Sequence, residues 1–142
     1  MNLAAYAKQL DGLLYNKPMA GDQILHAMGM TKEEFRQVVL YHRMTLSGKA
    51  PWRTTPAALV QYYDSDVSYY EVSDDPVKLR AWARTRIKDG DTRLATIYAV
   101  SSVMVMLTRA SSREGRKARL VVKHVGRLVD DLDDLYSEVS LP

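Results

Sequence analysis

Apolar residues recur at helical spacing along most of the chain, and this pattern predicts helices separated by short polar breaks. Over residues 3–15 the apolar positions return every three or four residues, and a break that contains Pro18 ends the helix. A short helix is expected over residues 21–28, and a longer one over residues 31–45. Each segment has one apolar face, as a helix that packs against a core requires.

The rest of the chain continues the helical pattern after one polar interruption. Thr55 and Pro56 are expected to start a helix, because a hydroxyl cap followed by proline is typical of a helix start. Residues 64–75 are rich in turn-forming residues and form the best candidate boundary between two domains, although residues 67–72 offer a short strand. Further helices are predicted over residues 76–88, over residues 91–109 and from Ser111 onward.

Residues 21–40 fit the pattern of a helix-turn-helix. This motif needs apolar residues where its two helices pack, and a glycine where the short turn takes a positive φ. Counted from Gly21, the ninth residue is Gly29. The fourth, eighth, tenth, fifteenth and eighteenth are apolar: Ile24, Met28, Met30, Phe35 and Val38. The fifth position is usually small and here is Leu25, which implies a slightly altered helix crossing. We therefore predict that Thr31 opens a recognition helix.

The outer face of that helix carries residue types that read DNA. Arginine pairs with guanine, glutamine with adenine, leucine with a thymine methyl group, and glutamate accepts a hydrogen bond from cytosine. A hydroxyl and free N–H groups at the helix start hold a phosphate. The candidates are Thr31, Lys32, Glu33, Arg36, Gln37 and Leu40. The alternative is a plain surface, since Glu33 and Glu34 make the face less basic than many DNA readers.

Charge is strongly segregated, although the whole chain carries a net charge of only +3. Residues 109–127 hold seven basic residues and one acidic residue, whereas residues 128–142 hold five acidic residues. Such a positive block can recruit a polyanion, and basic residues at a helix start oppose the helix dipole, which suggests a partner. The candidate DNA contacts are Ser111, Ser112, Arg113, Arg116, Lys117, Arg119 and Lys123. The alternative is a solvated helix with internal ion pairs.

Residues 49–53 form a second basic segment, in a loop around a proline. Lys49, Trp52 and Arg53 are candidates for contacts with phosphates or the minor groove. The alternative for Trp52 is that its ring anchors the loop on the domain.

Composition excludes several other classes of protein. Hydrophobic residues make up 46% of the 142 residues and charged residues 26%, which is a globular balance. The chain has no cysteine, so disulfide scaffolds and thiolate sites are excluded. The longest uncharged run, between Arg93 and Arg109, is too short to span a bilayer. The start of the chain does not read as a secretory signal, so we expect a soluble cytoplasmic protein without a membrane partner.

Catalytic signals are poor. Metal-like spacing is missing among the three histidines, and His42 and His124 read as core residues. No phosphate-binding glycine loop or nucleophile elbow is present. We therefore expect no enzymatic activity, no metal site and no cofactor.

A helix-turn-helix at residues 21–40, followed by a helical region with the basic segment 111–117, resembles the immunity repressors of temperate mycobacteriophages that bind many asymmetric stoperator sites. The resemblance spans the whole chain in size and layout. It implies a lysogeny repressor in the bacterial host cell that blocks transcription from phage promoters. It also implies two DNA-reading regions in one chain, which binds an asymmetric site as a monomer; a dimer is the alternative.

Together these patterns predict an all-α protein. A helix-turn-helix DNA-binding domain is expected over residues 1–63, and a second small helical domain with another DNA-binding surface over residues 64–142. The expected function is sequence-specific binding of double-stranded DNA for transcriptional repression. The rival is a protein-interaction module, such as an antitoxin or phage adaptor, whose basic helix docks an acidic partner.

Overall fold

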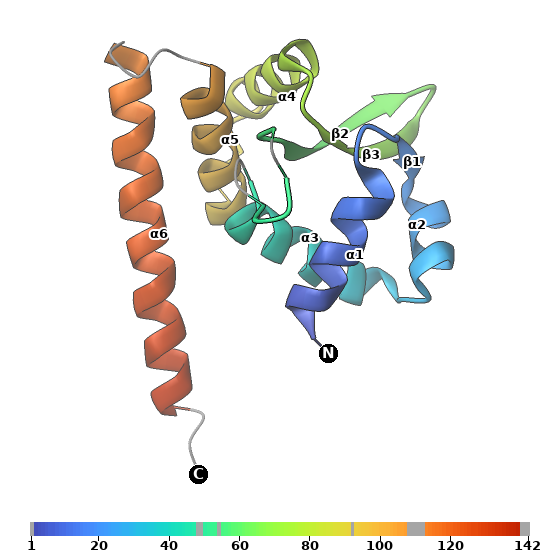
Figure 1. Ribbon diagram of the computed structural model, residues 1–142, viewed down its shortest axis with the longest axis horizontal. Helices are drawn as coiled ribbons and strands as arrows, with labels where there is room; N and C mark the ends of the chain where they lie inside the picture. Colours follow the sequence, from blue (N-terminus) through green and yellow to red (C-terminus); the bar gives the residue numbers. More distant parts are fainter. Residues whose placement is uncertain (1, 48–49, 54, 92, 108–112, 140–142) are drawn as a thin grey trace.

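A computed structural model describes residues 2–47, 50–53, 55–91, 93–107 and 113–139. Helices and a three-stranded antiparallel sheet make up this part of the chain (Figure 1). In chain order they are α1 (Leu3–Leu14), β1 (Met19–Ala20), α2 (Gly21–Met28), α3 (Lys32–Thr45), β2 (Ala58–Asp64), β3 (Val67–Ser73), α4 (Pro76–Lys88), α5 (Leu94–Leu107) and α6 (Arg113–Val139). The prediction of an all-α protein is therefore wrong, because the fold is mixed α/β.

The helices begin and end where the sequence provides caps. The Asn2 side chain accepts a hydrogen bond from Ala5 N–H at the start of α1 (3.1 Å). Asp75 caps α4 through Val77 N–H (2.9 Å), with Pro76 as the first helical residue. Gly90 takes a φ of +65° just after α4, as a left-handed helix end requires. The helices predicted over residues 3–15, 21–28, 31–45, 76–88 and 91–109 are all present.

The sheet replaces the helix that Thr55 and Pro56 were expected to start. Strand β3 lies between β1 and β2, and Leu59 pairs with Val72 in the β2–β3 register. The turn between β2 and β3 has positive φ at Ser65 and Asp66 (50° and 66°), as tight two-residue hairpins require. The strand suggested over residues 67–72 is therefore real. The predicted division after residue 63 lies next to this turn, so residues on both sides of it share one sheet.

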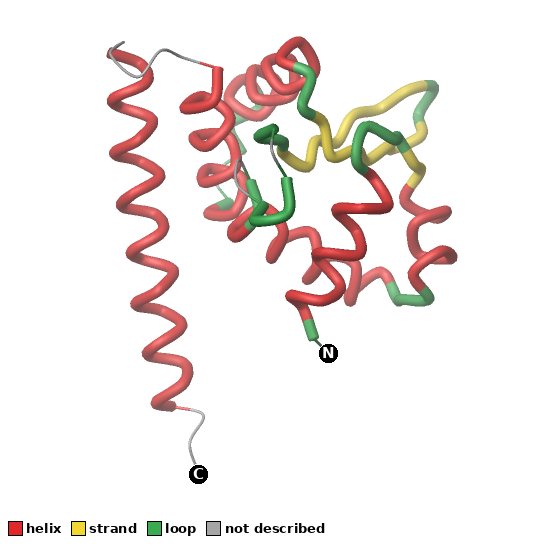
Figure 2. The backbone as a smooth tube through the Cα atoms, in the orientation of Figure 1, coloured by secondary structure: helices red, strands yellow, loops and turns green. Residues whose placement is uncertain are grey.

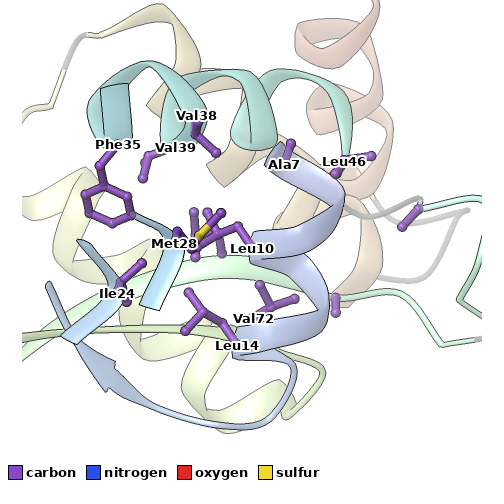
Figure 3. Close-up of a cluster of buried hydrophobic side chains, with 13 residues drawn as sticks. Ala7, Leu10, Leu14, Ile24, Met28, Phe35, Val38, Val39, Leu46 and Val72 are labelled. Carbon is purple, nitrogen blue, oxygen red and sulfur yellow. The ribbon is translucent and has the colours of Figure 1, made fainter. Parts of the chain in front are cut away.

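Helices lie on both sides of the sheet (Figure 2). Each face of the sheet covers one cluster of buried side chains. On one face Leu59 and Val72 join a cluster from α1, α2 and α3 that includes Leu10, Leu14, Ile24 and Val38 (Figure 3). On the other face Ala58 and Val60 join α4 and α5, with Leu79, Trp82 and Val103. Each fully buried aliphatic side chain of this size contributes about 1.5–3 kcal/mol to stability.

Helix α6 packs along α5, on the opposite side of the molecule from α2 (Figure 1). Gly115 and Ala118 are buried on α6, whereas Leu120 and Val121 are 56% and 37% exposed. Helix α6 therefore contacts α5 rather than the first helix of the helix-turn-helix.

Candidate nucleic-acid interface

Helices α2 and α3, with the turn between them, form the helix-turn-helix that residues 21–40 predict. Gly29 ends α2 with φ 61° and ψ 41°, the left-handed conformation expected for the turn glycine. The N–H of Met30 donates to the carbonyl of Leu25 (3.1 Å), which closes the helix end. The predicted packing positions are buried or partly buried: Ile24, Met28, Met30, Phe35 and Val38.

Helix α3 has one packed face and one exposed polar face. Phe35, Val38 and Val39 are buried in the first cluster. Lys32, Glu33, Arg36 and Gln37 are exposed, and Leu40 is half-buried at the edge of this face. Arg36 Nη1 lies 4.0 Å from Glu33 Oε2, and the Arg36 side chain is 74% exposed. An exposed pair of this kind is worth about 0–1 kcal/mol, so it leaves both side chains available to another partner.

The start of α3 uses the capping box that Thr31 and Glu34 predict. Thr31 Oγ1 accepts from Glu34 N–H (3.2 Å), and Glu34 Oε1 accepts from Thr31 N–H (3.0 Å). Hydrogen bonds from Thr31 also hold the pKa of the Glu34 carboxyl below its usual value. A phosphate at this helix start would therefore meet a carboxylate that already occupies the Thr31 N–H.

The loop that contains Trp52 and Arg53 is fixed to the body of the protein. Trp52 Nε1 donates to Asp11 Oδ2 (2.8 Å), and the Arg53 guanidinium forms an ion pair with the same carboxylate. The Trp52 ring nevertheless stays partly exposed, with the Lys8 ammonium 5.4 Å from its centroid. Trp52 thus anchors the loop on the domain, which is the alternative role given for it above. The charge of Arg53 is already compensated by Asp11. Lys49 lies outside the described residues.

Asp11, the shared partner of Trp52 and Arg53, is a residue that the spacing of charges does not single out. It is 1% exposed on α1, and its Oδ1 also lies 2.7 Å from His42 Nε2 on α3. Burial alone would raise the pKa of the Asp11 carboxyl. The hydrogen bonds from His42 and Trp52 and the charge of Arg53 outweigh that effect, and the pKa lies below its usual value. Asp11 shares the buried face of α1 with Leu10 and Leu14, a position that demands a partner.

The basic residues of α6 form a second candidate surface. Arg113, Arg116, Lys117, Arg119 and Lys123 are all exposed on this helix. They stand apart from the exposed face of α3, because α6 packs on α5 at the other side of the molecule (Figure 1). Ser111 and Ser112 lie outside the described residues. The predicted site residues thus form two separate surfaces.

The β2–β3 hairpin lies next to the helix-turn-helix, but its tip is acidic. Asp64 and Asp66 flank Ser65 at the turn, and all three are exposed. Behind the tip, the rings of Tyr62 and Tyr69 stack with centroids 6.0 Å apart. The hairpin tip therefore carries the wrong charge to hold a phosphate group.

No family model, curated protein or solved structure matches the chain at a significant level. Among the described residues, no group of three or more histidine or acidic side chains is arranged to hold a metal ion. The helices in the same part of the chain are also too short or too polar to cross a membrane.

Proposed function

We propose that this protein is a sequence-specific repressor that binds double-stranded DNA with α3 as its reading helix. The observation that carries the proposal is the division of α3 into a packed face and an exposed face that presents Arg36 and Gln37. In a helix-turn-helix the second helix lies in the major groove. There arginine and glutamine read guanine and adenine through paired hydrogen bonds.

The surroundings of the two helices support this proposal. Helix α1, strand β1, the helix-turn-helix and the β2–β3 hairpin follow one another in the order of a winged helix-turn-helix, with β3 in the middle of the sheet. The buried face of α3 packs on this framework, and a reading helix needs such support from behind. We assign the reading role to Lys32, Glu33, Arg36, Gln37 and Leu40. Arg53 is left out because Asp11 already compensates its charge.

The basic face of α6 is the second DNA contact in this proposal. Its exposed lysines and arginines supply the charge that α3 lacks, because Lys32 and Arg36 are offset by Glu33 and Glu34. Two different surfaces in one chain suit a monomer on an asymmetric site. Together with the resemblance to stoperator-binding repressors, this favours a lysogeny repressor that acts in the cytoplasm of a bacterial host.

The deciding experiment is a selection of bound sequences from a random duplex library, followed by affinity measurements at several salt concentrations. We expect an asymmetric consensus, and an affinity for the selected duplex that falls steeply with salt. A palindromic consensus would support a dimer. Absence of any enriched sequence, together with salt-independent binding, would contradict the proposal.

A second candidate function is a protein-interaction module. It is favoured by the exposure of Leu120 and Val121 on α6, directly beside basic residues. An apolar strip next to positive charge suits an acidic protein partner. Tight binding to an acidic protein, with no preference among duplex sequences, would favour this candidate.

A further inference from the structure

A cavity of about 780 Å³ opens between α3, the β2–β3 hairpin and the start of α5. Its volume falls in the range of small-molecule sites, about 300–1,000 Å³. Phe35, Val39, Tyr70 and Leu94 contribute apolar walls, and Phe35 and Tyr70 meet edge to face with ring centroids 5.0 Å apart. Such walls favour a ligand with an apolar, preferably aromatic, group.

Arg43 lies in the wall of this cavity and lacks an anionic partner. The residue is 4% exposed, and its Nε is buried without a hydrogen-bond acceptor. Within the described part of the chain no carboxylate lies at ion-pair distance from Arg43. Burial lowers the pKa of Arg43 to about 10, so the guanidinium remains charged at neutral pH.

The acidic residues at the end of α4 and just after it are already paired with other arginines. Asp91 Oδ2 lies 2.7 Å from Arg93 Nη2 and 3.6 Å from Arg86 Nη1, and Asp89 Oδ2 lies 3.0 Å from Arg86 Nη2. The two acidic residues are thus matched by two arginines, and Arg43 adds a third positive charge. Lys32, Arg36 and Arg93 also line the cavity, where Asp22 is the one acidic side chain among the described residues.

A purely structural role does not account for this arrangement. The Arg43 guanidinium lies 5.5 Å from the centroid of the Trp82 ring. A contact of this kind stabilises a desolvated cation. That gain is smaller than the free energy lost when a charge is buried without a counterion. A bound anion would offset the difference.

We propose that this cavity binds a small organic anion with an apolar body, such as an aromatic carboxylate, whose charge pairs with Arg43. The apolar body would lie against Phe35, Tyr70 and Leu94, and the carboxylate would accept hydrogen bonds from the guanidinium. Lys32, Arg36 and Leu40 line the cavity and also belong to the exposed face of α3. If α3 reads DNA as proposed above, the anion would compete with DNA and act as an inducer. The binding itself does not depend on that function.

The test is calorimetric titration of the full chain with 2-naphthoate and with the neutral 2-naphthamide, in the absence of DNA. A charge-assisted hydrogen bond contributes about 1.5–3 kcal/mol, so we expect naphthoate to bind at least about tenfold more tightly than the amide. Arg43→Met should reduce the affinity for naphthoate to that for the amide. Arg84→Met, which removes an exposed arginine of α4 outside the cavity, should leave it unchanged.

Amide chemical shifts of the wild-type chain provide a second readout that does not require the Arg43 variant to fold. Naphthoate should shift the signals of residues 39–44 and 94–95 and leave those of α6 unchanged. Equal affinity for naphthoate and the amide, no binding at millimolar concentration, or shifts confined to other elements would overturn the proposal. Because no DNA is present, these outcomes are independent of whether the protein is a repressor.

Discussion

Asp11 on α1 and His42 on α3 are joined by a hydrogen bond of 2.7 Å that is closed to solvent. The same carboxylate accepts hydrogen bonds from Trp52 and Arg53. This one side chain therefore connects α1, α3 and the loop after α3. Removing one partner of a buried charged network typically costs about 3–5 kcal/mol.

We therefore expect Asp11→Ala to lower the free energy of unfolding by about 3–5 kcal/mol, because Arg53 would be left buried without a counterion. Urea denaturation followed by circular dichroism measures this change. Asp22→Ala, which removes an exposed carboxylate at the start of α2, should cost no more than about 1 kcal/mol. Equal effects of the two substitutions would show that the network does not stabilise the fold.

Stability should fall as the pH drops below about 6.5. Burial lowers the pKa of His42 from its usual value of 6.5. Below pH 6.5 this histidine therefore binds a proton in the unfolded chain while it stays neutral in the native chain. The stabilisation is complete above pH 6.5 and decreases by about 1.4 kcal/mol per pH unit until the native pKa is reached. Asp11, whose pKa is lowered from 3.8, adds a further loss in more acidic solution.

Urea midpoints measured from about one pH unit above to about 1.5 pH units below the usual histidine pKa test this expectation. His42→Gln should flatten the pH dependence, whereas His26→Gln, a change at an exposed residue of α2, should preserve it. A wild-type stability that is constant over this range would mean that His42 takes up its proton equally well in the native chain.

Arg36→Ala and Gln37→Ala should each weaken specific DNA binding by about 1–3 kcal/mol and relax the preference at one or two base pairs. Both side chains are exposed on α3, so the fold should remain intact. Fluorescence anisotropy with the selected duplex and with single-base variants measures both effects. Arg84→Ala, on α4, is the matched control. Unchanged affinity and unchanged base preference in both α3 variants would exclude α3 as the reading helix.

Substitutions on α6 should change the salt dependence rather than the sequence preference. Arg113→Ala, Lys117→Ala and Arg119→Ala each remove an exposed charge, and each lost phosphate contact should flatten the slope of log K against log salt by about 0.9. Affinities at several salt concentrations give this slope. If the slope stays the same while the melting temperature changes, the charges serve stability within α6 rather than DNA binding.

Gly29→Val should destabilise the protein by about 1–3 kcal/mol, because a β-branched residue resists the φ of +61° at this turn. A Cβ at Gly29 would meet no other atom within 4 Å, so the cost comes from the backbone alone. Gly29→Asn is the control, since asparagine tolerates this conformation. Thermal melts of both variants separate the two effects, and an equal loss of stability would show that the backbone conformation is not the cause.

The helices could be predicted from the sequence because their signals are local. Thr31 and Glu34, or Asp75 and Pro76, lie within one turn of the groups that they satisfy. The sheet could not be predicted in the same way. Leu59 faces one cluster while Ala58 and Val60 face the other, so β2 shows no alternation of polar and apolar residues. Thr55 and Pro56, which lie just before this apolar segment, are typical of a helix start and therefore favour a helix.

The exposed face of α3 could be predicted from the spacing of its polar residues, although its contact with DNA stays a prediction. The anchoring of Trp52 and Arg53 could not, because their partner Asp11 lies about 40 residues earlier in the chain. One local signal was available. Asp11 lies between Leu10 and Leu14 on an apolar face, and a buried carboxylate requires a hydrogen-bond donor or a positive charge beside it. The juxtaposition of Arg43 with Trp82 depends on how the tertiary fold places α3 and α4 against α5.

The central position of β3 has a consequence for the order in which the chain folds during synthesis. Val72 accepts a hydrogen bond from Asn16 N–H (2.7 Å) and is fully buried beside Leu14. A nascent chain that ends at α3 therefore contains three helices whose apolar faces are not yet covered by the sheet. Such intermediates are prone to aggregate. A segment that carries the helix-turn-helix to another protein must accordingly extend at least to Ser73, because a graft that stops before β3 would leave Leu14 exposed to water.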